Sequence, residues 1–306
     1  MTEGSFLVGV NLPWFHYGGD VGANTWRPDG GIARPDRLAE ADAALGRLAD
    51  QGVTVVRWFL LCDARAGVLP DPDGGPAGLD EAVSRDLDAA LGLLEKHRLQ
   101  AMFALLDFLL ARRARDVDGV RTGGRAAWLR REDWRQRLVE RVLVPVATRV
   151  AGSAALHSWD LLNEPEWITL GWGGLDPRQS VPQAAMRSFL GDCVSGLRSV
   201  ASTPITVGLA SVRGLPLVAG LGLDFYQVHW YDHVDPPASL AVPAADWKLD
   251  APLLLGEFPT AGSSQPVAAI LSAVRKAGYV GALAWSALSA DPFSNWSGRD
   301  GKPSLA

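Results

Sequence analysis

Two hydrophobic patterns alternate along the whole chain. The first is a short, nearly continuous apolar run, which is typical of a parallel strand buried on both faces. Eight such runs predict strands over Phe6–Asn11, Val53–Phe59, Leu99–Leu106, Leu156–Leu162, Pro204–Leu209, Asp224–His229, Pro252–Glu257 and Val280–Trp285. The second pattern spaces apolar residues like one face of a helix. It predicts helices over Arg37–Gln51, Leu79–Lys96, Glu132–Val150, Gln183–Val200 and Val267–Ala277.

Three segments give a weaker helical pattern. Leu215–Ala219 and Ser239–Trp247 follow the fifth and sixth strands and predict shorter helices. After the eighth strand only Ser286–Ala306 remains, and it is rich in Gly, Pro, Ser and Asp. Because these residues favour turns, the last helix is expected to be short or missing.

Strands that alternate with helices over the full length predict a (β/α)8 barrel. No composition shift, linker or low-complexity segment interrupts residues 1–306, so we expect a single domain. A doubly wound open sheet is the alternative. It would be expected to carry a glycine-rich phosphate loop after the first strand, and Gly9-Val-Asn-Leu-Pro-Trp14 is not such a loop.

Charge and composition exclude some classes of partner. The net charge of -5 argues against a nucleic-acid ligand, which requires a basic surface. No apolar run approaches the length of a membrane span, so we expect no membrane partner. The N-terminus lacks a basic leader region, and the chain as written is expected to be cytoplasmic, or secreted if a leader has been removed. Two buried free thiols at Cys62 and Cys193 are favoured over one disulfide.

The candidate chemistry lies where two predicted strands end. Trp159-Asp-Leu-Leu-Asn-Glu-Pro-Glu166 and Pro252-Leu-Leu-Leu-Gly-Glu-Phe258 each carry an apolar run into a carboxylate. The carboxyl ends of barrel strands share one rim, so Glu164 and Glu257 are expected to meet there. Such a pair is what a glycosidase needs, with one acid/base and one nucleophile about 5–5.5 Å apart if configuration is retained. Taken alone, Asn163-Glu164-Pro165 is equally consistent with a turn that caps a helix.

Three further rim residues would support that pair. Arg57 lies inside an apolar strand, and a buried cation needs a nearby carboxylate, for which Glu257 is the expected partner. His229 and Tyr231 are two residues apart and face the same way, so one can orient the acid/base and the other can bond the nucleophile. A core His and Tyr, each satisfied by backbone, is the alternative. His229 and His233 with Asp232 and Asp235 match no regular ligand spacing, and no metal or cofactor is expected.

Other rim positions are candidates for binding a sugar. Asn11, Asp107 and Asn163 end the first, third and fourth strands. Tryptophan is frequent, with 12 in the chain, and indole faces stack on the C–H faces of sugar rings. Any single tryptophan can equally be a core residue, and we favour Trp14 and Trp285 as platforms. The predicted rim tryptophans are Trp14, Trp26, Trp58, Trp167, Trp172, Trp230 and Trp285.

These residues, in this order, resemble the clan A glycoside hydrolases, and most closely family 5, the cellulase and β-mannanase family. The matching elements cover essentially the whole chain: Gly9-Val-Asn11, Arg57, Asn163-Glu164-Pro165, His229-Trp-Tyr231, Glu257 and Trp285. The resemblance implies a retaining β-glycoside hydrolase with Glu164 as acid/base and Glu257 as nucleophile. Arg57, Asn163, His229, Tyr231 and Trp285 would line the subsite at the cleavage point. Many family members carry a His near the end of the third strand, where this chain has Asp107.

The resemblance leaves the substrate open. An endo-acting enzyme on a β-1,4-linked glucan or mannan is the first expectation, with an oligo- or polysaccharide as its partner. An exo-acting β-glycosidase on short oligosaccharides or glycosides is the alternative. A carbohydrate-binding barrel without catalysis is a third possibility, and it would be free to lose either glutamate. A lyase or aldolase would normally need a rim lysine or a metal cluster.

Overall fold

A computed structural model describes residues 6–288 and 291–295 of the chain. Within these residues, nine parallel strands form one sheet in the order β10-β11-β12-β13-β1-β2-β5-β8-β9. The strands are β1 (Leu7–Asn11), β2 (Val55–Phe59), β5 (Gln100–Asp107), β8 (Leu156–Asn163), β9 (Ile205–Thr206), β10 (Gly208–Leu209), β11 (Tyr226–His229), β12 (Leu253–Pro259) and β13 (Gly281–Trp285). Each predicted strand is confirmed, with ends shifted by at most two residues.

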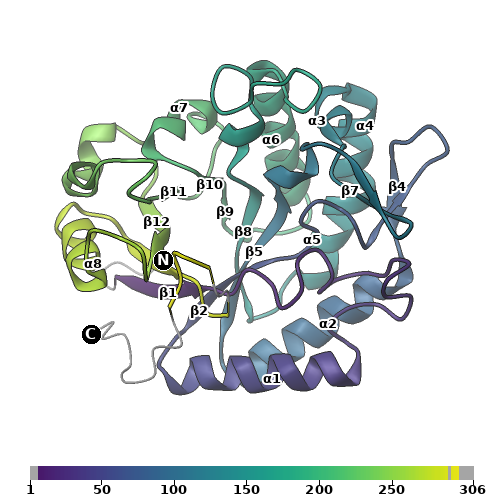
Figure 1. The fold of residues 1–306 in the computed structure, drawn as a ribbon, viewed down its shortest axis with the longest axis horizontal. Helices are drawn as coiled ribbons and strands as arrows, with labels where there is room; N and C mark the ends of the chain where they lie inside the picture. The colour runs from purple at the N-terminus through teal and green to yellow at the C-terminus, as the bar shows by residue number, and fades with distance from the viewer. Residues whose placement is uncertain (1–5, 289–290, 296–306) are drawn as a thin grey trace.

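The two ends of this sheet are one strand interrupted at a single residue. β9 pairs with β8, where Ile205 lies opposite Trp159, and β10 pairs with β11, where Gly208 lies opposite Gln227. Val207, between β9 and β10, is fully buried. The predicted fifth strand therefore closes the sheet, and the described residues form the expected (β/α)8 barrel (Figure 1).

Helices surround this barrel on its outside (Figure 1). They are α1 (Pro35–Asp50), α2 (Glu81–Lys96), α4 (Glu132–Leu138), α5 (Val144–Val150), α6 (Gln183–Arg198), α7 (Leu215–Val218) and α8 (Val267–Lys276). The helix predicted over Glu132–Val150 contains a π-helical turn, η2 (Val139–Leu143). The helix predicted from Leu79 begins two residues later, because Asp80 caps it by accepting hydrogen bonds from the backbone N–H groups of Ala82 and Val83. The segment Ser239–Trp247 forms two 3-10 turns, η5 (Pro237–Ala241) and η6 (Ala244–Trp247).

Two small β-hairpins lie in the loops and were not predicted. β3 (Val68–Pro70) pairs with β4 (Pro76–Leu79), and β6 (Arg115–Val117) pairs with β7 (Val120–Thr122). A short helix, α3 (Ala126–Arg130), follows the second hairpin. These strands are mostly exposed and carry no apolar run. The apolar-run pattern that predicts buried strands therefore does not detect them. Asp118 and Gly119, both at positive φ, form a turn signal that could have located β6 and β7.

The barrel interior has an apolar lower layer and a polar upper layer. Val55, Met102, Phe225, Leu254 and Leu283 form a separate buried cluster near the start of the strands. Side chains two positions further along a strand point the same way and lie nearer the C-terminal rim. That step leads from Val55 to Arg57 and from Phe225 to Gln227. The apolar layer therefore supports a polar layer from below.

Two further expectations concern the chain outside the barrel. Cys62 and Cys193 are both buried and unbonded, as predicted. No helix among the described residues is long and apolar enough to cross a membrane. The expectation of a short or missing last helix falls largely on residues 289–290 and 296–306, which lie outside the described residues.

Candidate active site

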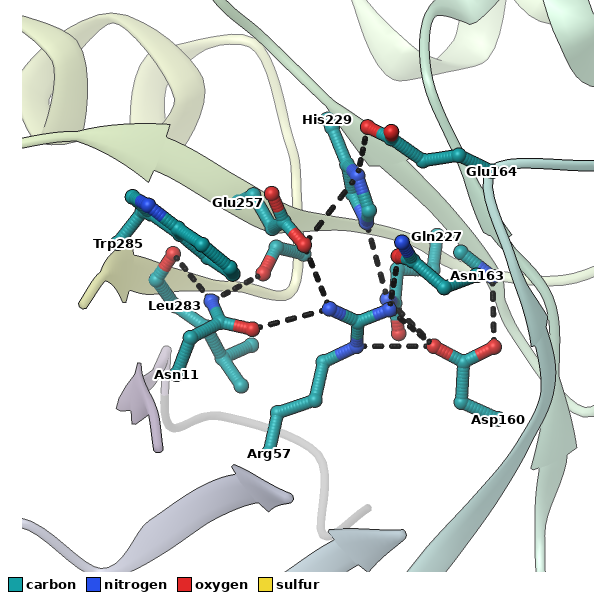
Figure 2. A network of polar contacts seen from close by, with 12 residues as sticks. Asn11, Arg57, Asp160, Asn163, Glu164, Gln227, His229, Glu257, Leu283 and Trp285 are labelled. Carbon is teal, nitrogen blue, oxygen red and sulfur yellow. Dashed lines mark hydrogen bonds and ion pairs between the residues drawn. The ribbon is translucent and has the colours of Figure 1, made fainter. Parts of the chain in front are cut away.

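Glu164 and Glu257 face one another across the C-terminal rim of the barrel. Glu257 lies in β12, and Glu164 directly follows β8. A carboxylate oxygen of Glu164, one of Glu257 and a ring nitrogen of His229 all lie within 4.8 Å of one another. That spacing is close to the separation of about 5–5.5 Å found in retaining glycosidases and too short for a water to be activated between inverting carboxylates. Figure 2 shows the two side chains converging on His229.

Glu257 is buried and held at both oxygens. Its Oε1 accepts a hydrogen bond from Arg57 Nη1 at 2.6 Å, and its Oε2 accepts one from the Tyr231 hydroxyl at 2.8 Å. The expected ion pair with Arg57 is therefore present. The Gln227 side chain fills the space beside Gly256. A Cβ at Gly256 would lie 2.4 Å from the Gln227 Cγ.

Arg57 is the centre of a fully buried network (Figure 2). Its Nε and Nη2 both donate to Asp160 Oδ2, at 2.9 and 2.6 Å. Its Nη2 also donates to Asn163 Oδ1 at 2.7 Å, and its Nη1 donates to Asn11 Oδ1 at 3.0 Å. Two carboxylates thus share one guanidinium, which compensates the desolvation of all three groups.

Asn11 and Arg57 lie beneath the cleft, whereas the sequence prediction placed them in its lining. Both side chains are fully buried, and neither lines the cleft. Asn11 Nδ2 donates to the carbonyls of Gly256 at 2.9 Å and Ala284 at 3.3 Å. These bonds aim the Asn11 oxygen at Arg57. Asn11 and Arg57 therefore act on the site by positioning Glu257.

Glu164 adopts a backbone conformation that is rare for residues other than glycine. Its φ of 50° and ψ of 55° lie in the left-handed region, and its backbone N–H donates to Gly208 O at 2.7 Å. Strain of this kind persists where surrounding structure enforces it, and it concentrates at functional sites. The Glu164 carboxyl meets His229 Nδ1 through Oε1 at 2.9 Å and accepts a bond from Trp167 Nε1 through Oε2 at 2.7 Å.

The proton on His229 is assigned from its neighbours. Gln227 Nε2 donates to Asp160 Oδ2 at 3.2 Å and lies 3.4 Å from His229 Nε2. An amide nitrogen cannot accept, so His229 Nε2 is the acceptor and its Nδ1 carries the hydrogen. Burial lowers the pKa of His229 to about 4, and the ring is therefore neutral at pH 7. His229 thus donates a hydrogen bond to Glu164.

The two glutamates are both buried, but their polar partners differ. Burial raises the pKa of Glu164 above its ordinary value, and it raises the pKa of Glu257 as well. At Glu257 this is opposed by direct contact with Arg57 and by the Tyr231 hydroxyl, both of which favour the anion. Glu164 makes no direct ion pair with Arg57. The geometry therefore assigns the negative charge to Glu257 and the proton to Glu164.

A cleft of about 380 Å³ opens above the pair. Trp14 and Trp285 form part of its wall, with ring centroids 6.3 Å apart, and Trp285 Nε1 donates to Asp291 Oδ2 at 2.9 Å. Asn163 and Asp107 lie on another part of the wall. Both predicted platforms and two of the three predicted polar residues, Asn163 and Asp107, therefore border one cavity.

Asp107 serves its neighbours as an acceptor. Its Oδ1 accepts from the backbone N–H of Leu109 at 2.8 Å and from the Tyr17 hydroxyl at 3.1 Å, and its Oδ2 accepts from Asn163 Nδ2 at 3.0 Å. Burial raises the pKa of Asp107 to about 6. Asp107 therefore holds the Asn163 amide through one of its two N–H hydrogens. The other hydrogen can donate toward the cleft.

Sequence reasoning missed Asp160 and Gln227, and it placed Trp167 at the rim without its bond to Glu164. A single carboxylate within the apolar run Trp159–Leu162 was a usable signal for Asp160, because such a group needs a buried partner. Gln227 carried no signal of its own. Two of the predicted rim tryptophans, Trp58 and Trp230, are core residues.

The histidines and acids considered for a metal site do not converge. His233 stacks on Phe293 with ring centroids 5.0 Å apart, Asp232 accepts from the Ser264 hydroxyl at 2.6 Å, and Asp235 lies 3.3 Å from Arg213. Glu164, His229 and Glu257 lie close enough to hold one cation. Arg57 and Tyr231 already occupy both oxygens of Glu257, however, and that arrangement fits an anionic nucleophile better than a metal ligand.

Comparisons with known proteins agree with the resemblance seen in the sequence. No family model matches the chain. A mannan endo-1,4-beta-mannosidase from Mytilus edulis is 22% identical, over 92% of this chain and 83% of that protein.

Solved structures extend the likeness to the fold. An endo-1,4-beta-mannanase from Eisenia fetida superposes with a TM-score of 0.78 at 21% identity, over 95% of this chain and 87% of that one. The beta-mannanase of Mytilus edulis gives 0.75 at 20% identity, over 94% and 88%. These structures share the (β/α)8 barrel with this chain.

Proposed function

We propose that this chain is a retaining β-glycoside hydrolase that cleaves β-1,4-linked mannan at internal bonds. The observation that carries the proposal is the pair of carboxylates within 4.8 Å, of which one is bonded to a guanidinium and a phenol and the other to a neutral imidazole. Mannan as the polymer and the endo mode rest on the names of the similar proteins.

In the first step the Glu257 carboxylate attacks the anomeric carbon. The bond to the leaving oxygen breaks as an ester bond to Glu257 forms, and Glu164 passes its proton to that oxygen. Arg57 and Tyr231 hold the Glu257 carboxylate in place and keep it anionic. The His229 bond and the Trp167 bond fix Glu164 on the opposite side of the cleavage point.

In the second step water replaces Glu257. The ester has removed the negative charge of Glu257, so the pKa of Glu164 falls and its carboxylate can take a proton from water. The Arg57 guanidinium stays compensated throughout, because Asp160 remains bonded to it at 2.6 Å. The water oxygen attacks the anomeric carbon from the side that the leaving group vacated, and configuration is retained overall.

The test is product analysis on mannan, β-glucan, xylan and short oligosaccharides, with Glu257→Ala alongside. The proposal predicts oligomers of several sizes from mannan, with the β-anomer appearing first by NMR. Release of monosaccharides from chain ends alone would instead identify an exo-acting β-glycosidase. Binding without turnover would indicate a carbohydrate-binding barrel, and an α-anomer as the first product would contradict the retaining mechanism.

A further inference from the structure

A series of hydrogen bonds runs along the wall of the cleft from Tyr17 to Asn163. The Tyr17 hydroxyl donates to Asp107 Oδ1 at 3.1 Å, and Asn163 Nδ2 donates to Asp107 Oδ2 at 3.0 Å. Asp107 and Asn163 end the neighbouring strands β5 and β8, where they lie opposite one another in register. All three residues line the cleft. The series therefore ends at the residue that directly precedes Glu164.

The Asn163 amide is held in one orientation by neighbours of opposite character. Its Oδ1 accepts from Arg57 Nη2 at 2.7 Å, so a flipped amide would set two donors against each other on that side. On the other side, a flipped amide would set its oxygen against the Asp107 carboxylate. In the orientation observed, the second Nδ2 hydrogen is left for a ligand. Asn163 can therefore meet a substrate as a donor through that hydrogen.

The ring of Tyr17 is held in place by its neighbours. The Trp14 ring lies edge-on to it with centroids 4.8 Å apart, and Arg65 Cζ lies 4.5 Å from the centroid of the Tyr17 ring. Arg65 is itself paired with Asp63 at 2.8 Å. Burial raises the pKa of Tyr17 far above its usual value, so the hydroxyl keeps its proton and donates. The hydroxyl is thus placed on Asp107 before a substrate binds.

Asp107 is held by three neutral donors. The backbone N–H of Leu109 and the Tyr17 hydroxyl both bond Oδ1, which leaves Oδ2 for Asn163. Burial raises the pKa of Asp107, and these three donors oppose that rise by favouring the anion. Hydrogen bonds to an ionised acceptor are stronger than those between neutral groups. Removal of the Tyr17 hydroxyl would therefore weaken the acceptor that holds Asn163.

We propose that Tyr17 and Asp107 are positioning residues that aim the free N–H of Asn163 at the sugar hydroxyl next to the attacked carbon. This inference rests on the proposed function. Hydrogen bonds to that hydroxyl strengthen in the transition state, so the aim of the Asn163 N–H affects the rate more than it affects binding. Neither Tyr17 nor Asp107 transfers a proton in this role.

The experiment compares two substrates that differ in one hydroxyl. Both are 4-nitrophenyl β-mannobiosides, and one lacks the 2-hydroxyl on the sugar that is attacked. Tyr17→Phe keeps the ring and should lower kcat for the complete substrate about tenfold, with KM unchanged within about twofold. On the 2-deoxy substrate the loss should shrink to less than about twofold, because the hydroxyl that Asn163 meets is absent. A purely structural role would lower both rates alike.

Asp107→Asn tests the second positioning residue. An amide has one oxygen, which cannot serve both the Leu109 N–H and the Asn163 Nδ2 as the two carboxylate oxygens do. We expect kcat for the complete substrate to fall about 10²-fold, and the loss on the 2-deoxy substrate to be at least about tenfold smaller.

Two further variants serve as controls. Tyr226→Phe removes a hydroxyl that also bonds an aspartate, Asp250 at 2.6 Å, but Tyr226 does not line the cleft, so neither rate should change. Tyr17→Phe added to Asn163→Ala should lower kcat no further, since the two residues act through one interaction.

Each other outcome separates the inference from the proposed function. Equal losses on both substrates, no loss in Tyr17→Phe, or a full further loss in the double variant would overturn the inference while hydrolysis itself stands. If Asp107→Asn does not fold, Tyr17→Phe decides by the same comparison. If the native protein cleaves neither the mannobiosides nor mannan, the proposed function fails and takes this inference with it.

Discussion

The two layers of the barrel interior differ in what they tolerate. The lower layer packs Val55, Met102, Leu254 and Leu283 against Phe225, and burial of apolar surface stabilises it without any special geometry. The upper layer buries charged Arg57, Asp160 and Glu257 one step higher on the strands, where each group depends on a named partner. The barrel therefore concentrates the cost of buried charge in the layer that faces the cleft. Substitutions in each layer should therefore affect stability and catalysis differently.

The largest effect is expected at the nucleophile. Glu257→Ala should lower kcat by about 10⁴-fold or more, since no other group can form the ester. Azide added to the variant should restore turnover of a fluoride substrate and give an α-configured azide product. The readouts are the initial rate and the NMR spectrum of the product. Near-full activity of Glu257→Ala would remove it from the mechanism.

The next effect distinguishes the two layers directly. Asp160→Asn leaves Arg57 with one carboxylate fewer, which should lower the free energy of unfolding by about 3–5 kcal/mol and also reduce kcat. Leu254→Ala in the lower layer should cost a similar amount, about 2–5 kcal/mol, while the folded fraction keeps its kcat. Denaturant unfolding and active-site-normalised rates measure both. Equal losses of kcat in the two variants would contradict the division into layers.

A smaller effect concerns the acid/base. Burial raises the pKa of Glu164, so the carboxyl stays protonated above the ordinary range, and activity should fall as pH rises through that pKa. Glu164→Gln should lower kcat/KM for mannopentaose by about 10²–10³-fold, with a smaller loss for a fluoride substrate. The alkaline limb of the pH profile should disappear in the variant. A limb that persists unchanged would assign it to another group.

The smallest effect is on stability beside the cleft. Burial raises the pKa of the Glu166 carboxyl to about 8, and no cation of the described residues pairs with it. The folded state then binds a proton that the unfolded state releases between about pH 4.5 and 8, so stability falls as pH rises through this window. Glu166→Gln should remove this slope, and the variant should exceed the native protein by a few kcal/mol at pH 9 but not at pH 4. Thermal unfolding at both pH values checks the sign, and parallel curves at both would contradict it.

Part of the site could be predicted from the sequence because the carboxyl ends of the barrel strands lie on one rim. Glu164, Glu257, His229 and Tyr231 each follow from their place at the end of an apolar run. Their pairwise contacts were harder to obtain, because the sequence does not fix which of several facing groups meet. The predicted pair of Arg57 with Glu257 is present, but the sequence did not show that Asn11 and Arg57 lie beneath the lining of the cleft.

Local periodicity and the βα alternation suffice to predict the order of strands and helices, the closed parallel barrel and the rim on which both glutamates lie. The folded barrel was needed to show that Asp160 shares Arg57 with Glu257, that Gln227 sets the tautomer of His229 and that Trp167 bonds Glu164. Those contacts join residues from different strands and loops. Their partners depend on stagger and side-chain depth inside the barrel, and these are set when the whole sheet closes.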